Sequence, residues 1–241
     1  MKILFIRHGD PNYKLDCLTD KGKIEAELLS ERLVKENIKK IYCSPLGRAR
    51  LTAEPTLKKL GMEAEILPWL REFDLNQIKL PYSETEQIPW DVLPEYINTL
   101  EKIYTPYGWL DEEIIRNSKL PDAYKSICCE LDSLLLSHGY KRDGYNYKAV
   151  APSHDTVAFI CHFGTTATLL SHLMNCSPYS LWQHLCTPTT SVTTVYTEER
   201  IEGKALFRAS SIGDVSHLYA AGEEVSFSGR FCECFTDTTR H

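Results

Sequence analysis

Short hydrophobic runs alternate along the first third of the chain with longer segments of helical periodicity. The runs at 2–6, 40–44 and 63–67 predict short buried strands. Between them, helices are expected from about Asp20 to Glu36 and from Pro45 to about Leu60. The first helix is expected to face the core with Ile24, Leu28, Leu29 and Leu33. This alternation of strands and helices is typical of a parallel α/β sheet.

The pattern becomes irregular in the middle of the chain. From about residue 76 to residue 122, repeated prolines and aromatic residues predict a partly helical insertion over one side of the sheet. A helix from about Asp122 to His138 follows, residues 140–153 are expected to form a polar loop, and residues 157–161 form the most apolar strand. The aromatic residues of the insertion either line a pocket or simply pack together: Trp90, Tyr96, Tyr104, Tyr107 and Trp109.

The last regular pattern is a pair of alternating segments, 191–196 and 205–209, which predicts a β-hairpin. Together the elements predict an α/β fold, a three-layer α/β/α sandwich with a mostly parallel central sheet. A length of 241 residues and a hydrophobic content of 43% suit one domain over 1–241 that carries the insertion.

Composition limits the classes of binding partner and the cellular compartment that we expect for this protein. The formal net charge of -6 gives no bulk electrostatic support to nucleic-acid binding. No apolar run approaches the roughly 20 residues that cross a bilayer, so no membrane partner is expected. The first residues enter a strand without the pattern of a signal peptide, which predicts a cytoplasmic protein whose nine cysteines are reduced thiols.

Charged side chains follow three of the predicted strands. Arg7 and His8 end the first strand, Arg48 lies just after the second, and His162 follows 157–161. Because ligands of an open α/β sheet bind outside the carboxyl ends of its strands, we expect these residues to lie close together. Two arginines and two histidines near helix N-termini are suited to bind an anion, most naturally a phosphoryl group.

The same residues belong to a longer series of motifs. These are Arg7-His8-Gly9, Leu18-Thr19-x-x-Gly22, Ser44-Pro45-Leu46-x-Arg48-Ala49-x-x-Thr52-Ala53, Leu70-Arg71-Glu72, Cys161-His162-Phe163-Gly164 and Gly213-Asp214-x-Ser216-His217-Leu218. The series resembles that of the histidine phosphatase superfamily, also called the phosphoglycerate-mutase-like family. The motifs occur in the family's order and cover nearly the whole chain, and the Ser44–Ala53 segment is the most specific.

The resemblance implies a mechanism. His8 would be the nucleophile that attacks phosphorus and forms a phosphohistidine, which water then hydrolyses. Arg7, Arg48 and His162 would bind the phosphoryl oxygens and stabilise their charge during transfer. The family uses no metal or organic cofactor for this chemistry, so none is expected, and the expected partner is a small-molecule phosphomonoester.

The leaving alkoxide needs a proton, and three carboxyl groups are candidates for the general acid. Glu72 matches the family's acid position, and Asp74 is the second candidate. Asp10 is a weaker third candidate, close in sequence to Arg7 and His8. Neighbouring arginines would lower the pKa of Glu72, whereas a general acid must stay protonated. Partial burial or the substrate dianion would offset that effect.

Departures from the family pattern favour a phosphatase over a mutase. The sequence reads Asp10-Pro11-Asn12-Tyr13 where many members carry Glu-Thr and a later Asn, and the small polar insert with which mutases hold a bisphosphate is absent. The insertion has few basic residues, which favours a monoester substrate. A phosphoglycerate-type mutase and a non-catalytic phosphate-binding protein on the same fold are the two alternatives.

Overall fold

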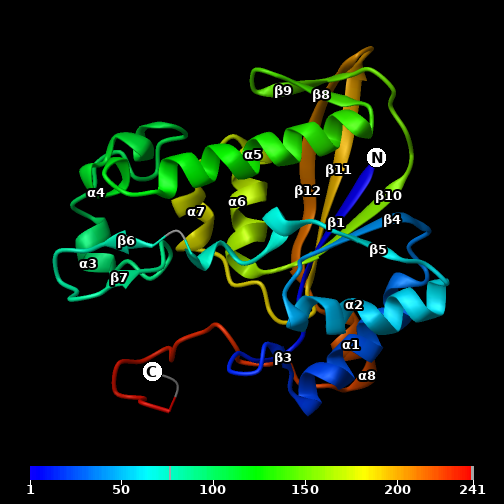
Figure 1. Ribbon diagram of the computed structural model, residues 1–241, viewed down its shortest axis with the longest axis horizontal. Helices are drawn as coiled ribbons and strands as arrows, with labels where there is room; N and C mark the ends of the chain where they lie inside the picture. Colours follow the sequence, from blue (N-terminus) through cyan, green and yellow to red (C-terminus); the bar gives the residue numbers. More distant parts are fainter. Residues whose placement is uncertain (76, 240–241) are drawn as a thin grey trace.

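An eight-stranded mixed sheet forms the centre of the computed structural model, which describes residues 1–75 and 77–239 (Figure 1). The strand order is β5-β4-β10-β1-β11-β12-β9-β8. The strands of this sheet are β1 (Lys2–Arg7), β4 (Ile38–Cys43), β5 (Ala64–Ile66), β8 (Tyr140–Asp143), β9 (Asn146–Ala149), β10 (Thr156–Cys161), β11 (Val192–Ile201) and β12 (Lys204–Asp214). Two shorter antiparallel pairs lie outside it: β2 (Pro11–Asn12) with β3 (Cys17–Leu18), and β6 (Ile78–Lys79) with β7 (Glu86–Gln87).

The two halves of the main sheet differ in strand direction. β5, β4, β10 and β1 are parallel neighbours, whereas β11, β12, β9 and β8 add to β1 through antiparallel pairs. The predicted α/β class is confirmed, and the sheet is mixed rather than mostly parallel. Antiparallel strands need only short turns between them, and the predicted hairpin is present in longer form as β11 and β12.

The expected polar loop at 140–153 is wrong, because this segment forms the hairpin of β8 and β9 at the sheet edge. Tyr140 and Tyr147 are each 2% exposed, while most neighbouring positions are polar and open to solvent. One buried side chain in each four-residue strand is too few to produce a clear hydrophobic alternation.

Helices cover both faces of the sheet (Figure 1). α1 (Asp20–Leu33) and α2 (Gly47–Leu60) pack together on one face, with α8 (Ser216–Ala221) against α1. α5 (Leu120–Ser137), α6 (Phe163–Met174) and α7 (Pro178–Trp182) lie on the other face. The short 3-10 helices η1 (Pro68–Leu70) and η2 (Phe73–Leu75) lead from β5 into the irregular stretch.

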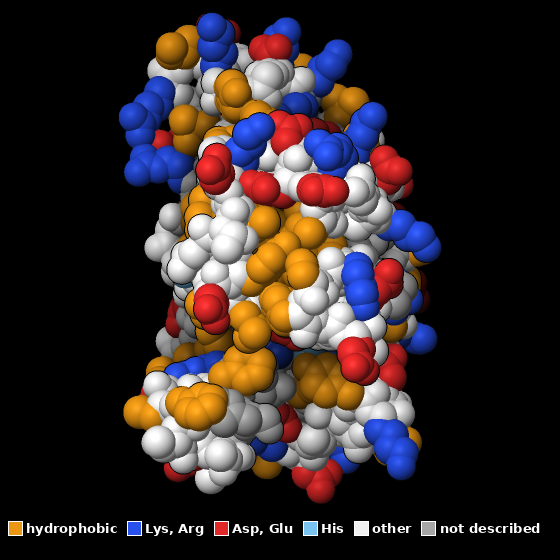
Figure 2. Space-filling model, turned by 90° about the vertical axis from the view of Figure 1, so that its left-hand side faces the viewer, with side chains coloured by type: hydrophobic (Ala, Val, Ile, Leu, Met, Phe, Trp, Pro, Cys, Tyr) orange, Lys and Arg blue, Asp and Glu red, His pale blue; other side chains and the backbone are white. Residues whose placement is uncertain are grey.

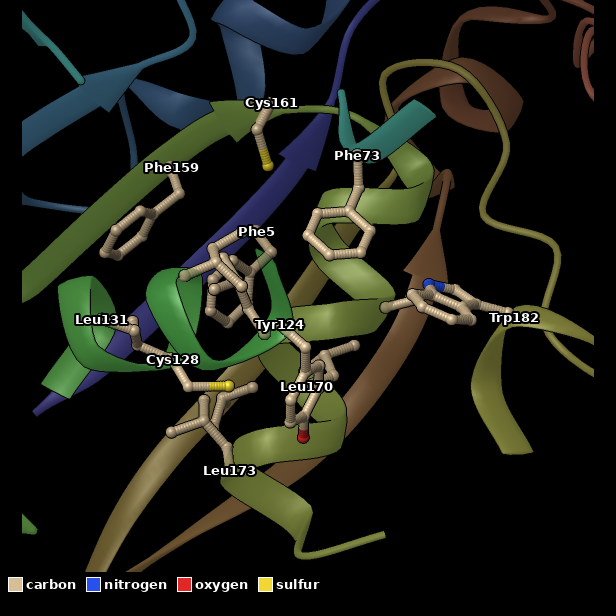
Figure 3. Close-up of a cluster of buried hydrophobic side chains, with 14 of the residues drawn as sticks. Phe5, Phe73, Tyr124, Cys128, Leu131, Phe159, Cys161, Leu170, Leu173 and Trp182 are labelled. Atoms are coloured by element: carbon tan, nitrogen blue, oxygen red, sulfur yellow. The ribbon is translucent and has the colours of Figure 1, made fainter. Parts of the chain in front are cut away.

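The central strands separate two hydrophobic clusters because their side chains alternate between the faces. In β1, Ile3 and Phe5 point to the cluster under α5 and α6, and Leu4 and Ile6 point to the cluster under α1 and α2. Figure 3 shows part of the first cluster, where Phe5 lies over helical side chains that include Leu170. Both clusters contain many fully buried apolar residues. Because these residues are closely packed, they fix the positions of the ends of β1, β4 and β10.

The first helix ends at Leu33, earlier than expected, and it buries Leu29 and Leu33 of the predicted stripe. Ile24 is 51% exposed, whereas Glu25 is fully buried. The Glu25 carboxylate accepts hydrogen bonds from the Asp10 backbone N–H and from the Thr189 hydroxyl, both at 2.8 Å. The predicted stripe is therefore wrong at Ile24, because a buried polar group that is hydrogen-bonded takes a core-facing position.

The predicted insertion is partly helical, with α3 (Pro94–Ile97), η3 (Gly108–Asp111) and α4 (Glu113–Arg116) beside β6 and β7 (Figure 1). Its first residue, 76, lies outside the described residues. Its aromatic residues do not form a common pocket wall. Trp109 is fully buried against Tyr124, whereas Tyr104 and Tyr107 are 42% and 51% exposed. Trp90 alone approaches the strand-end residues, with its ring 5.9 Å from that of Phe163.

Candidate active site

Three neighbouring parallel strands end at the same edge of the sheet. β1 ends at Arg7, β4 at Cys43 and β10 at Cys161. The His8 backbone N–H donates to the Cys161 carbonyl at 3.0 Å, and the Ser44 N–H donates to the Ile160 carbonyl at 2.9 Å. These bonds continue the ladder one residue beyond the strands, so the residues that follow each strand are fixed side by side.

His8 lies at the centre of this edge and is 1% exposed. Its Nδ1 lies 2.7 Å from the Gly9 carbonyl oxygen, which can only accept a hydrogen bond. Nδ1 is therefore assigned the proton, and Nε2 keeps its lone pair. Burial lowers the pKa of His8 well below its usual range, and the charges of Arg7 and Arg48 lower this pKa further.

His162 occupies the position just before the first turn of α6 and is fully buried, with its ring centroid 5.0 Å from that of His8. Its Nε2 lies 2.7 Å from the Ser44 hydroxyl oxygen. Burial also lowers the pKa of His162 well below its usual range, followed by the effects of His8 and the nearby arginines. Burial therefore favours the neutral form of both imidazoles.

The two predicted arginines are buried but are held by different segments. Arg7 donates from Nη1 to the carbonyls of Thr187 at 2.7 Å and Ser228 at 3.1 Å. Arg48, in the first turn of α2, donates from Nη1 to the Asp16 carboxylate at 2.7 Å. Their exposed fractions are 5% and 7%, so both guanidinium groups act in a largely desolvated environment.

Three buried nitrogens of these side chains have no hydrogen-bond partner among the described residues: Arg7 Nε, Arg48 Nε and His162 Nδ1. A buried polar atom without a partner costs about 1–3 kcal/mol. An anion with several acceptor oxygens would bind such donors favourably. The cluster is thus chemically suited to an anion such as a phosphoryl group.

Glu72 reaches the same region from the segment after η1. Its Oε1 accepts hydrogen bonds from the Phe73 N–H at 2.9 Å and the Thr165 N–H at 3.1 Å, in the first turn of α6. Burial raises the pKa of Glu72, and this effect outweighs the opposing hydrogen bonds and the charge of Arg7. Gly164 makes this approach possible, since a Cβ there would lie 2.8 Å from Glu72 Oε1 and 2.3 Å from the Trp90 ring.

The other two candidate acids differ in their surroundings. The Asp74 carboxyl has an oxygen, Oδ1, that is buried without a partner among the described residues. The Asp10 carboxylate instead accepts from the Thr19 hydroxyl at 2.6 Å and from the Ser226 hydroxyl. Both Asp10 oxygens are thus engaged in bracing the loop after His8, which favours a structural contribution.

The sequence reasoning missed a contact from the end of the chain. Ser226 binds Asp10 and the Ser228 carbonyl binds Arg7, so part of the C-terminal segment, residues 222–239, lies against Arg7 and the loop after His8. In Figure 2 a furrow crosses the side of the molecule above this segment, with hydrophobic side chains along its edges and Lys or Arg side chains inside it. No local pattern in the segment signals this placement.

Arg71 and His217 complete the surroundings. Arg71 lies close enough to contribute to the lowered pKa of His162, and the motif Leu70-Arg71-Glu72 was the signal available for it. His217 is 9% exposed, with Nε2 3.1 Å from the Thr190 hydroxyl, and Thr190 N–H donates to the His8 carbonyl. Burial lowers the pKa of His217 to about 4. His217 therefore supports the His8 backbone.

The described residues contain neither a metal-binding cluster nor a helix suited to cross a membrane. No group of three or more His, Cys, Asp or Glu side chains there is arranged to hold a metal ion. Within residues 1–75 and 77–239, none of the helices combines the length and the apolar character that a membrane span requires.

Comparisons with known proteins agree with the motif series. A sequence profile of the histidine phosphatase superfamily (branch 1) matches residues 3–116. A probable phosphatase of Schizosaccharomyces pombe is 27% identical over 237 residues, which are 90% of this chain and 95% of that protein. A probable phosphoglycerate mutase GpmB of Photorhabdus laumondii is 31% identical over 88 residues, 33% of this chain and 41% of that protein.

Solved structures share the fold. A phosphoserine phosphatase mutant from Entamoeba histolytica in complex with phosphoserine has a TM-score of 0.60 at 18% identity, covering 90% of this chain and 98% of that chain. The native mycobacterial glucosyl-3-phosphoglycerate phosphatase also has a TM-score of 0.60 at 18% identity, covering 88% and 98%. At these identities the likeness is one of architecture.

Proposed function

The chain belongs to the histidine phosphatase superfamily (branch 1), and we propose that it hydrolyses phosphomonoesters through a phosphohistidine at His8, without a metal or organic cofactor. The observation that carries this proposal is the state of His8. Its Nδ1 is bound to the Gly9 carbonyl at 2.7 Å, and Arg7 and Arg48 lie close enough to lower the pKa of its ring. A neutral imidazole whose Nε2 has a free lone pair is a competent nucleophile toward phosphorus.

In the first step, His8 Nε2 attacks phosphorus and the bond between phosphorus and the ester oxygen breaks. Arg7, Arg48 and His162 stabilise the charge on the three equatorial oxygens. Glu72 gives its proton to the departing oxygen, so the alcohol leaves neutral. The raised pKa of Glu72 supports this assignment, because it keeps more of the carboxyl protonated.

In the second step, water attacks the phosphohistidine. The Glu72 carboxylate takes a proton from this water, the bond between phosphorus and His8 Nε2 breaks, and inorganic phosphate leaves. Glu72 is then protonated again and His8 is neutral, so the site returns to its starting state. The same group serves as acid and then as base because the two steps are chemically the reverse of each other.

The test is hydrolysis of p-nitrophenyl phosphate in the presence of a chelator. We expect metal-independent turnover that His8→Ala reduces by at least about 10³-fold, with an unchanged circular dichroism spectrum. His154→Ala is the matched control, since His154 is exposed and should leave turnover unchanged. Turnover that persists in folded His8→Ala would refute the proposed nucleophile.

A phosphoglycerate-type mutase is the second candidate, because the local similarity to a probable mutase includes 31% identity over 88 residues. A mutase returns the phosphoryl group to the substrate and needs a bisphosphate primer. Release of inorganic phosphate from a monoester without any primer would favour the hydrolase. Primer-dependent isomerisation without net phosphate release would favour the mutase.

A further inference from the structure

A carboxylate from the loop after His8 is bound to one of the proposed phosphate-binding arginines. Asp16 Oδ1 accepts from Arg48 Nη1 at 2.7 Å, and Asp16 Oδ2 accepts from the Gly47 backbone N–H at 2.6 Å. The two oxygens of one carboxylate therefore engage both the guanidinium group and the N-terminus of α2. This is a bridging arrangement, which holds the carboxylate in one orientation.

The backbone conformation at Asp16 and the absence of a side chain at Gly47 allow this contact. Asp16 has a φ of 47°, in the left-handed region that aspartate adopts more readily than most residues with a side chain. Gly47 permits the approach, since a Cβ at that position would lie 2.2 Å from the Asp16 carbonyl oxygen. The contact between residues 16 and 47 thus involves backbone as well as side chain, and the carboxylate is a fixed part of the site.

Asp16 stands on the solvent side of the phosphate-binding residues. Its side chain is 41% exposed, whereas that of Arg48 is 8% exposed. Tyr13, from the same loop, is 61% exposed, with its ring centroid 5.4 Å from the Arg48 guanidinium carbon and 6.4 Å from the His8 ring. A phosphomonoester held for attack by His8 would therefore have its alcohol portion near Tyr13 and Asp16.

The charges in this region have opposite effects on the two ends of a substrate. The reacting phosphoryl group meets Arg7, Arg48 and His162, which are buried and attract it. A second anionic group on the alcohol portion would meet the fixed carboxylate of Asp16, which already occupies Nη1 of Arg48. Like charges at a partly exposed site repel each other, and an uncharged alcohol portion escapes this repulsion.

We propose that Asp16 is a specificity-determining residue that selects against phosphomonoesters carrying a carboxylate or a second phosphate on the alcohol portion. The preferred substrates are then monoesters whose alcohol portion is neutral or cationic. This inference rests on the proposed phosphatase function, because it concerns which monoester the His8 site accepts.

Two other roles for Asp16 make different predictions. If Asp16 only braced Arg48, its loss would slow every substrate by a similar factor. If Asp16 were an internal anion that the reacting phosphoryl group displaces, its loss would improve KM for every substrate by a similar factor. Only a specificity-determining role changes the ratio between substrates that differ by one charge.

The test compares glycerol 3-phosphate with 3-phosphoglycerate, which differ by a carboxylate in place of a hydroxymethyl group. Phosphate release gives kcat/KM for both compounds. If one of them is not turned over, its affinity is measured from its inhibition of p-nitrophenyl phosphate hydrolysis. We expect the native protein to favour glycerol 3-phosphate by about tenfold, and Asp16→Asn to reduce this preference at least about threefold. Asparagine tolerates a positive φ and can still accept from the Gly47 N–H.

Two controls make the result specific. Asp16→Glu keeps the charge and should retain most of the preference, and Asp143→Asn removes an exposed charge on β8 and should leave the ratio unchanged. An unchanged ratio in Asp16→Asn would overturn the proposal. A native preference for 3-phosphoglycerate would also overturn it and would point to Arg71 as the site of a second anion. Absence of His8-dependent p-nitrophenyl phosphate hydrolysis would instead refute the proposed function itself.

Discussion

Two parts of the candidate site are built in different ways. Arg7, His8, Arg48 and His162, here called the floor, are at most 7% exposed and lie at or just beyond the ends of strands and in the first turns of helices. The rim consists of Tyr13, Asp16 and residues 226–229, which lie in a loop and in the irregular C-terminal segment. Regular elements fix the floor, as phosphoryl transfer requires. Loops form the rim, where recognition of different substrates can vary.

The largest loss of activity is expected when a charged side chain of the floor is removed. Arg48→Ala should lower kcat/KM for p-nitrophenyl phosphate by about 10²–10³-fold, because one preorganised donor to the transferring group is lost. Arg50→Ala is the matched control, since Arg50 lies on the same helix but is exposed. Equal effects of the two substitutions would mean that Arg48 acts only through the overall charge of α2.

The general acid gives the next largest effect, and its size depends on the substrate. Glu72→Gln should slow hydrolysis of an alkyl phosphate by about 10²-fold, because the alkoxide then leaves without a proton. The loss for p-nitrophenyl phosphate should be much smaller, because nitrophenolate leaves readily. Similar losses for both substrates would count against Glu72, and Asp74→Asn should then be compared in the same assay.

Burial of the floor histidines predicts a dependence of stability on pH. The folded pKa values of His8 and His162 lie well below 6.5, so the unfolded chain binds more protons below that pH. The free energy of unfolding should therefore fall as the pH drops from about 7 to 5, by up to about 1.4 kcal/mol per pH unit for each histidine. Urea unfolding measures this slope. His162→Asn should reduce it and the exposed His154→Asn should not, whereas equal slopes in all three proteins would contradict the account.

The smallest effect is expected at the rim. Ser226→Ala removes the hydroxyl that binds the Asp10 carboxylate, and the loss of one such hydrogen bond, about 1 kcal/mol, should raise KM about two- to fivefold with little change in kcat. Ser137→Ala, at the exposed end of α5, is the control. If Ser226→Ala lowered kcat/KM as much as Arg48→Ala does, the floor and the rim would not differ in their contribution to activity.

Sequence reasoning succeeded where hydrophobic periodicity and residue chemistry coincide. The strands before His8 and His162 and the helix that contains Arg48 are recognisable because their side chains are buried in regular patterns. The mutual proximity of these residues then followed from the geometry of parallel strands. Whether His8, Arg48 and Glu72 have the roles assigned to them stays a prediction for the experiments above.

The sequence could not reveal contacts that depend on tertiary structure alone. Glu25 interrupts the expected apolar stripe because its two hydrogen-bond partners come from residues 10 and 189, far apart in the chain. The same holds for Ser228, whose carbonyl meets Arg7 although the two residues are 221 positions apart in the sequence. Backbone carbonyls of an irregular segment carry no side-chain signal, so only the folded structure identifies them.

The most direct test of the central claim is to trap the covalent intermediate. The protein is mixed rapidly with a monoester labelled with ³²P in its phosphoryl group, quenched in alkali, where phosphohistidine survives, and mapped by peptide. We expect label on the peptide that contains His8, formed at least as fast as turnover and absent in His8→Ala. Turnover without label on His8, or inversion of configuration at phosphorus, would contradict the account.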